Sequence, residues 1–203
     1  LNENKFKQFN NLIKNKIFTN NLINNVAATL NLVKDGKYTS VILNYDEKSE
    51  NLFKWYQQLI AESLGKKSKG ILPIVSSMPK DNHSLMQLYL DGPKKSFYTF
   101  FNVLDNRIIK LNNKKILSSH KYLRTQSIEK IKQSQMLATE KVFRFKKLPF
   151  RSFRILKRDE KSLGELFCFF ILETILLGRA LNVDPFDQPS VELIKTETRK
   201  ILS

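Results

Sequence analysis

The chain has 203 residues, 41% of them hydrophobic, which is enough for one domain with a real core. Its 35 basic and 19 acidic residues give a formal net charge of +16, a field that could attract nucleic acid, acidic lipid or an anionic metabolite. The sequence contains no run of about 18 apolar residues, so no membrane span is predicted. The single cysteine, Cys168, excludes an intrachain disulfide and favours a reducing, cytoplasmic location.

The basic residues are scattered along the chain in short clusters, such as those around Lys66, Lys94, Lys114 and Arg151. No single helix or tail collects them, which favours a solvated basic surface over a nucleic-acid groove. The first residues show neither a signal-peptide pattern nor an initiating methionine, so we expect the chain to begin inside a longer protein.

The first half of the chain alternates helical and strand patterns. Apolar residues recur at three- and four-residue steps over residues 4–31, with Asn20-Asn21 separating two predicted helices. A β-branched strand is expected over residues 39–45, after a turn at Asp35-Gly36. Helical spacing returns over residues 48–64, and Gly65 is well placed to end that helix.

The second half continues the alternation. Strands are expected at 70–75, 97–103 and 152–157, and helices at 82–91, 127–141 and 161–181, with a final helix that begins at Pro189. Asp81 is the predicted cap of the helix over 82–91, and Gly92-Pro93 should end it.

Strands that alternate with helices of 10 to 20 residues predict an α/β fold, with a mainly parallel sheet covered on both faces. Ligands of such sheets bind beyond the carboxyl ends of the strands, so loops 76–81 and 182–189 are the candidates for that rim. The chain has no glycine-rich nucleotide loop and no His/Cys cluster with metal spacing, so we expect no cofactor and no metal.

Four polar side chains near predicted helix ends could carry chemistry. Glu62 could act as a general base and His83 could shuttle a proton near neutral pH. Gln188 and Lys195 lie seven residues apart, about two helical turns, and could hold hydroxyl or phosphate oxygens. Each residue taken alone is more often a surface group, and Glu192 is the obvious surface partner of Lys195.

Three motifs in order make the functional interpretation more specific. They are Glu-Ser-x-Gly-Lys from Glu62, Asp-x-His-Ser-x-x-Gln from Asp81, and Asp-Gln-Pro-x-Val-Glu-x-x-Lys from Asp187. Together they resemble the signature set of the glucose-6-phosphate isomerase family. The similarity is weak before residue 50 and covers residues 55–200 well. It implies a three-layer αβα domain of the sugar-isomerase (SIS) type, with additional helices at both ends.

The resemblance also implies roles for the four residues. Glu62 would move a proton between carbon 1 and carbon 2 of the sugar through a cis-enediol. Lys195 and His83 would help to open the ring, with His83 lent by the neighbouring subunit of a homodimer, and Gln188 would lie near the substrate. The implied organisation is an N-terminal helical segment over 1–36, the SIS-type domain over 37–181, and a C-terminal loop and helix over 182–203.

The chain departs from the family pattern in two ways. Ala61, Met86 and Ser190 stand where the family usually has glycine, and each adds bulk beside a site residue. The Ser/Thr phosphate loop and the Gly-Gly-Arg segment of the family's first SIS domain are missing, so the chain reads as the second SIS domain of a larger isomerase.

Three functions therefore stay open at this point. The leading hypothesis is the C-terminal portion of an aldose–ketose isomerase that interconverts glucose 6-phosphate and fructose 6-phosphate. The second is a noncatalytic sugar-phosphate-binding SIS domain, which the missing phosphate loop favours. The third is a basic nucleic-acid-binding protein, motivated by the net charge alone.

Overall fold

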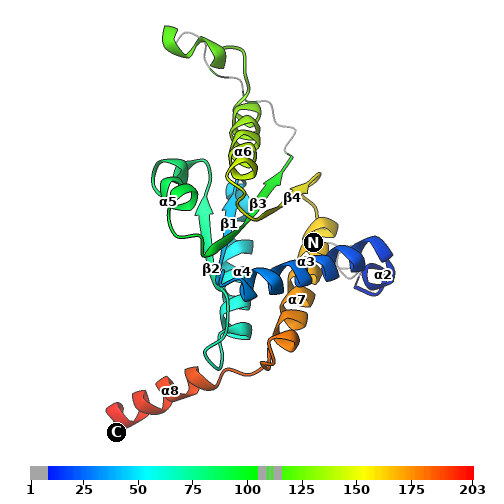
Figure 1. Cartoon of the computed structure of the whole chain (residues 1–203), viewed down its shortest axis with the longest axis vertical. Helices are drawn as coiled ribbons and strands as arrows, with labels where there is room; N and C mark the ends of the chain where they lie inside the picture. Colours follow the sequence, from blue (N-terminus) through cyan, green and yellow to red (C-terminus); the bar gives the residue numbers. More distant parts are fainter. Residues whose placement is uncertain (1–8, 105–108, 110, 112–115) are drawn as a thin grey trace.

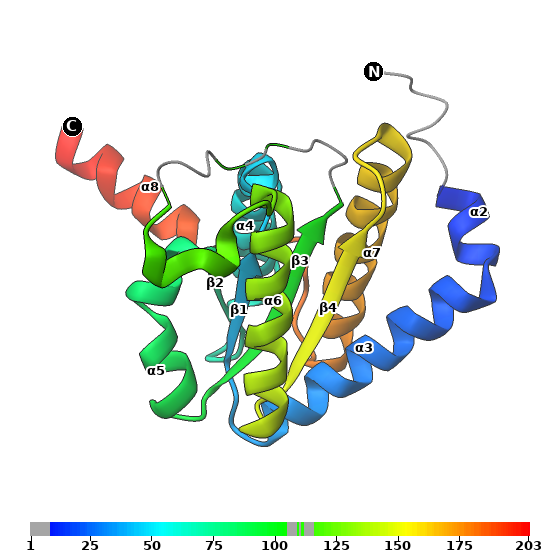
Figure 2. The same ribbon diagram turned by 90° about the horizontal axis from the view of Figure 1, so that it is seen from above.

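A computed structural model describes residues 9–104, 109, 111 and 116–203 of the chain. Its centre is one parallel sheet with strand order β2-β1-β3-β4, which Figures 1 and 2 show between two layers of helices. The strands are β1 (Thr39–Asn44), β2 (Leu72–Ser77), β3 (Ser96–Val103) and β4 (Phe150–Ile155). The prediction of a three-layer α/β/α fold is confirmed.

The helices complete the two outer layers. The α-helices are α2 (Phe9–Lys14), α3 (Lys16–Lys34), α4 (Glu50–Leu64), α5 (Met86–Asp91), α6 (Ile128–Phe145), α7 (Glu160–Ala180) and α8 (Pro189–Leu202). The described part of the chain also contains the short 3₁₀ turns η1 (Glu47–Ser49), η2 (Lys80–His83) and η4 (Ser118–Leu123). Among the described residues, no helix is long and apolar enough to cross a membrane.

Each face of the sheet has its own hydrophobic cluster, because successive side chains of a strand point to opposite faces. Ile42 of β1 packs with Phe53 of α4 and Phe170 of α7 on one face. Its neighbour Leu43 packs with Phe143 of α6 and with residues of α5 on the other face. Both faces are covered, which explains why β1 is a continuous apolar run instead of an alternating pattern.

The N-terminal helices divide at a different residue from the predicted one. Asn20 and Asn21 lie inside α3 on its exposed side, where asparagine costs a helix little. The break falls at Asn15, whose side-chain oxygen accepts hydrogen bonds from the backbone N–H groups of Ile17 (2.9 Å) and Phe18 (3.2 Å). The predicted start of this region, residues 4–8, lies outside the described residues.

Asp81 also differs from its predicted role. It lies within η2, and its carboxylate accepts a hydrogen bond from the N–H of Ser77 (2.8 Å), which precedes it in the chain. The predicted helix over 82–91 is therefore a 3₁₀ turn followed by the short α5, which ends at Gly92 as expected. The hydrogen bond from the Ser77 backbone to the Asp81 side chain has therefore replaced the predicted helix cap.

Two buried carboxylates hold the edge strand β4 to the helices on either side. Glu173 of α7 pairs with Arg151 through both of its oxygens. Glu140 of α6 accepts hydrogen bonds from Ser152 Oγ and Arg154 Nη2, both at 2.7 Å. Only 2% and 4% of the two glutamate side chains are exposed, so β4 is fixed from both faces.

The buried tyrosine Tyr98 leads us to expect that the stability of the protein falls at alkaline pH. Burial raises the pKa of Tyr98 to about 12, from about 10 in an unfolded chain. Its contribution to stability is complete below pH 10 and is lost as the pH rises toward 12, and it amounts to roughly 3 kcal/mol. We expect denaturant midpoints to fall over this window, and less steeply in Tyr98→Phe. Equal slopes for the two proteins would contradict this role of Tyr98.

Candidate active site

The site begins at the end of α4. This helix starts beyond the carboxyl end of β1 and runs back across the sheet, so Glu62 lies near the amino ends of the strands. Gly65 follows the helix, and a Cβ there would lie 2.7 Å from the carbonyl oxygen of Ala61. Glycine is required at this position for close packing, and Gly65 ends α4 as predicted.

Gln188 reaches Glu62 from the other end of the chain. The Gln188 amide donates to one carboxylate oxygen of Glu62 at 3.0 Å, and Gln58 donates to the other at 2.9 Å. Both donors are neutral, so they hold the carboxylate in place without cancelling its charge. Two of the four predicted site residues therefore lie in contact although 126 positions separate them.

Two lysines of the loop after α4 position the segment that carries Gln188. Lys66 donates to the carbonyl oxygen of Asp184 and pairs with the carboxylate of Asp187 at 2.9 Å, and only 8% of its side chain is exposed. Lys69 donates to the carbonyl oxygen of Leu181 at 2.8 Å. Sequence reasoning assigned no role to these lysines, although Lys66 closes the Glu-Ser-x-Gly-Lys motif.

Loop 182–189 consequently lies at the opposite edge of the sheet from the predicted one. Helix α7 follows β4 and, like α4, returns to the amino ends of the strands. Leu181 lies beside Tyr38 and Leu72, at the starts of β1 and β2, around a pocket of about 700 Å³ that Ala61 also lines. The prediction that this loop forms the carboxyl rim is wrong. Loop 76–81 does follow the carboxyl end of β2.

His83 lies apart from Glu62 in this chain. It is exposed in η2, just beyond the carboxyl end of β2, whereas Glu62 lies near the amino end. β2 has six residues, so the two edges are about 20 Å apart. This distance excludes direct proton transfer between Glu62 and His83 of one chain.

Lys195 lies on α8, which extends away from the body of the protein (Figure 1). Gln188 precedes the first turn of this helix, so Lys195 is about 10 Å farther along its axis. Its ammonium group pairs with Glu192 at 2.6 Å, the surface partner anticipated from the sequence. No residue of α8 is buried, so the helix end that carries Gln188 is near Glu62 while Lys195 projects outward.

No group of three or more potential metal ligands gathers among the residues that the structure describes. At the amino edge, the carboxylate of Glu62 lies beside the carboxamide of Gln188, and the ammonium group of Lys195 lies farther out. Such a set can abstract a proton and hold oxygen atoms.

Removing the Lys66 ammonium group tests how this loop is held. We expect Lys66→Ala to lower the free energy of unfolding by about 1–3 kcal/mol, because a carbonyl and a carboxylate lose their donor. Hydrogen exchange should also accelerate over residues 182–188. The control is Lys141→Ala, an exposed position on α6, which should shift stability by less than about 0.5 kcal/mol. Equal effects of the two substitutions would contradict the anchoring role of Lys66.

The fold and this edge define an α/β protein with a carboxylate–carboxamide site, and comparison with known proteins makes the class more specific. No family model matches the chain. The chain is 30% identical over 92% of its length to the probable glucose-6-phosphate isomerase of Methanococcus maripaludis, and 34% identical over 97% to the glucose-6-phosphate isomerase of Mycoplasmopsis pulmonis. These matches cover 42% and 47% of the relatives, so the chain spans less than half of their length.

Solved structures agree on the fold. A hypothetical protein from Thermus thermophilus superposes on 98% of the chain with a TM-score of 0.88, at 22% identity and over 49% of its own length. A glucose-6-phosphate isomerase from Chlamydia trachomatis superposes on 82% with a TM-score of 0.65, at 17% identity and over 35% of its length. The resemblance found in the sequence is confirmed as a similarity of most of the chain to less than half of curated glucose-6-phosphate isomerases.

Proposed function

We propose that these residues form the C-terminal portion of an aldose–ketose isomerase that interconverts glucose 6-phosphate and fructose 6-phosphate. The observation that carries the proposal is the contact between Glu62 and Gln188, since two separate family motifs meet at one carboxylate. The similarity to curated isomerases over most of the chain supports the same reading.

In the proposed mechanism Glu62 is the general base. Its carboxylate removes the proton from carbon 2 of the open-chain aldose and returns it to carbon 1, which gives the ketose through a cis-enediol. A weak carbon acid needs a base fixed in position, and the amides of Gln58 and Gln188 supply that constraint. Gln188 and Lys195 would contact substrate oxygens, and the net charge of +16 would speed the encounter with a dianionic sugar phosphate.

His83 fits this mechanism as a residue contributed to the site of another subunit. It is exposed, and about 20 Å separates its edge of the sheet from that of Glu62. A homodimer that brings the loop after β2 of one subunit to the amino edge of the other would complete the ring-opening machinery. A first SIS domain of the kind that the resemblance implies would supply the phosphate loop.

The test is an isomerase assay on two proteins. One is the 203-residue chain alone, and the other is a chimera in which the unmatched part of the Mycoplasmopsis pulmonis enzyme is joined to this chain. We expect little or no turnover from the chain alone and clear turnover from the folded chimera. A folded chimera without activity would reject the isomerase proposal, and full activity of the chain alone would reject the division of the site between two halves.

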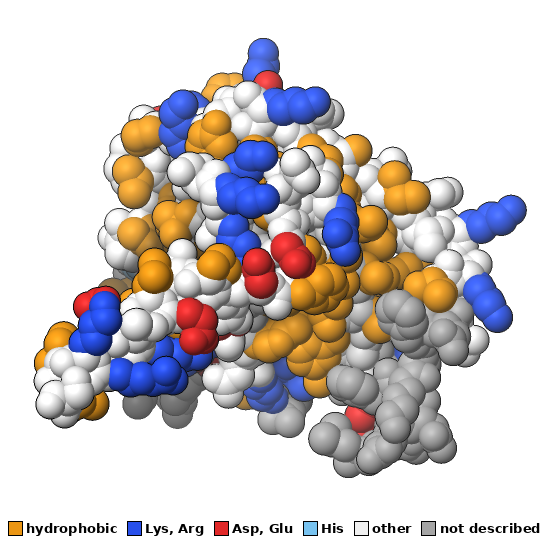
Figure 3. All heavy atoms as spheres, turned by 90° about the horizontal axis from the view of Figure 1, so that it is seen from below, with side chains coloured by type: hydrophobic (Ala, Val, Ile, Leu, Met, Phe, Trp, Pro, Cys, Tyr) orange, Lys and Arg blue, Asp and Glu red, His pale blue; other side chains and the backbone are white. Residues whose placement is uncertain are grey.

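A noncatalytic sugar-phosphate-binding domain is the second candidate, favoured by the coverage of less than half of each relative. It predicts saturable binding of fructose 6-phosphate by the chain alone and an inactive chimera. Nucleic-acid binding has less support, because the Lys and Arg side chains on the face in Figure 3 are dispersed among hydrophobic ones.

A further inference from the structure

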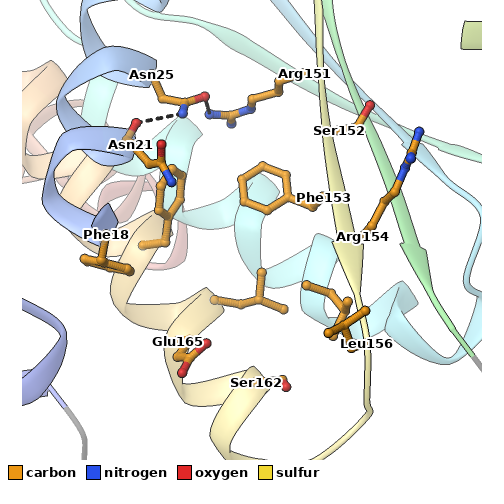
Figure 4. A pocket seen from close by; sticks show the side chains of 13 residues that line it. Phe18, Asn21, Asn25, Arg151, Ser152, Phe153, Arg154, Leu156, Ser162 and Glu165 are labelled. Atoms are coloured by element: carbon orange, nitrogen blue, oxygen red, sulfur yellow. Dashed lines mark hydrogen bonds between the residues drawn. The ribbon is translucent and has the colours of Figure 1, made fainter. Parts of the chain in front are cut away.

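Largely buried cations hold separate elements of this chain together. Arg151, drawn in Figure 4 beside Asn25 of α3, ties β4 to α7 through its pair with Glu173. Lys66 has a similar place near the proposed site, because its pair with Asp187 joins the loop after α4 to the loop after α7. The proposed mechanism uses neither member of this second pair, although each belongs to one of the motifs that form the site.

Apolar packing within this chain does not place Gln188. The loop after α7 is buried at Val183 and Pro185, and a Cβ on Gly178 would lie only 3.2 Å from the Cβ of that proline. Every residue over 186–203 is exposed. Burial therefore ends before Gln188, and polar contacts must set the position of its side chain.

The ion pair between Lys66 and Asp187 supplies such a contact one residue before Gln188. Its charged groups are 2.9 Å apart, and the Lys66 ammonium group also donates to the carbonyl oxygen of Asp184, so it bridges both ends of the turn over 184–187. Only 8% of the Lys66 side chain is exposed. An ammonium group so far removed from water is costly without its acceptors, which favours a firmly made pair.

The loop that carries Lys66 is itself fixed close to Glu62. The backbone N–H of Lys66 donates to the carbonyl oxygens of Leu64 (2.9 Å) and Lys69 (3.1 Å), and its carbonyl oxygen accepts from the N–H of Lys69 (2.9 Å). The two residues between these lysines have positive φ, 53° and 57°, which non-glycine residues keep only where the surroundings hold them. The anchoring ammonium group and the Glu62 carboxylate therefore belong to one closely bonded segment.

From these contacts we propose that Asp187 is a positioning residue of the isomerisation and acts through Gln188. Its ion pair with Lys66 sets the place at which the Gln188 amide meets the Glu62 carboxylate, 3.0 Å away. The carboxylate of Asp187 is engaged by Lys66, so its loss should affect the reaction only as far as Gln188 is displaced. This role rests on the proposed function, because that function makes the placement of Gln188 matter for turnover.

The test is a double-mutant cycle in the active chimera, with Asp187→Asn and Gln188→Ala made alone and together. The change at Asp187 keeps the shape of the side chain, of which 56% is exposed, so the fold should be preserved. Asp35→Asn is the matched control, because it makes the same change at an exposed position shortly before β1, at the same edge of the sheet. The measurements are kcat/KM for fructose 6-phosphate and urea unfolding of each variant.

We expect Asp187→Asn to lower kcat/KM by about tenfold, because a loosely held amide is misplaced relative to the substrate. Asp35→Asn should change kcat/KM by less than about twofold, since its exposed charge is screened by salt. In Gln188→Ala the further loss of Asp187 should change kcat/KM by less than about twofold, whereas its effect on stability should be equal in both backgrounds. A purely structural residue would instead lower kcat/KM by the same factor with and without Gln188.

The remaining outcomes separate this role from the proposed function. An active chimera in which the two losses multiply, or in which Asp187→Asn behaves like the control, overturns the role of Asp187 and leaves the isomerase proposal standing. A folded chimera without activity rejects both. If Asp187→Asn does not fold, NMR of the wild-type chain decides: side-chain amide signals of Gln188 shifted away from those of a free glutamine support the proposal, and signals at the free position overturn it.

Discussion

Replacing Glu62 by glutamine in the active chimera is expected to lower the turnover number by about a hundredfold or more, as the loss of a general base does. The amide keeps the shape of the side chain and can still accept a hydrogen bond from Gln188 or Gln58. Folding should therefore be preserved, and the loss should appear in kcat rather than in the Michaelis constant. The measurement is the steady-state conversion of fructose 6-phosphate to glucose 6-phosphate.

Glu47→Gln is the matched control for this substitution. Glu47 is exposed in η1 at the carboxyl edge of the sheet, far from the amino edge at which Glu62 lies. The same change of charge there should leave turnover nearly unaltered. Near-normal turnover of Glu62→Gln would remove Glu62 from the role of base, and an equal loss in both variants would indicate a general charge effect.

The buried ion pair between β4 and α7 should produce the largest change in stability. We expect Arg151→Met to lower the free energy of unfolding by about 3–5 kcal/mol, because the buried carboxyl group of Glu173 loses its bidentate partner. The same arginine also donates to Thr99 (3.0 Å) and Asn25 (3.1 Å), so α3 loses a contact as well. Urea unfolding followed by circular dichroism measures the change.

The double variant Arg151→Met/Glu173→Leu distinguishes two costs of removing Arg151. One is the unpaired buried carboxyl group of Glu173, and the other is the loss of the remaining contacts of Arg151. Exchange of both charges for apolar groups of similar volume should recover most of the loss, since no unpaired charge remains in the core. A double variant as unstable as Arg151→Met would show that the destabilisation comes from packing and from the bonds to Thr99 and Asn25. It would then not come from the buried carboxylate.

Local pattern was sufficient for most of the fold. The β-branched run at 39–45 became β1, Pro189 opens α8, and Ser127 caps α6 by accepting a hydrogen bond from the N–H of Lys130. The errors fell where side chains compete for the backbone. Asn15 ended the first helix instead of Asn20-Asn21, and Asp81 bound Ser77 instead of capping a long helix.

The sequence pattern was less informative about which residues lie in contact in the folded protein. The motifs named Glu62 and Gln188, and the structure places them 3.0 Å apart between donor and acceptor atoms. The edge of the sheet to which loop 182–189 returns was predicted wrongly: α7 follows β4 and runs back to the amino ends of the strands, so the loop after it lies at that edge. The anchoring contacts of Lys66 and Lys69 join segments more than 100 positions apart, and no local pattern signals such contacts.

By itself the sequence determined the alternation of strands and helices, the parallel sheet and the resemblance to an isomerase, because hydrophobic period, turn residues and short motifs are local properties. Tertiary structure alone decided that Glu62 meets Gln188 and how far His83 lies from both of them. Those features depend on strand order and helix packing, which are set by burial across the whole chain.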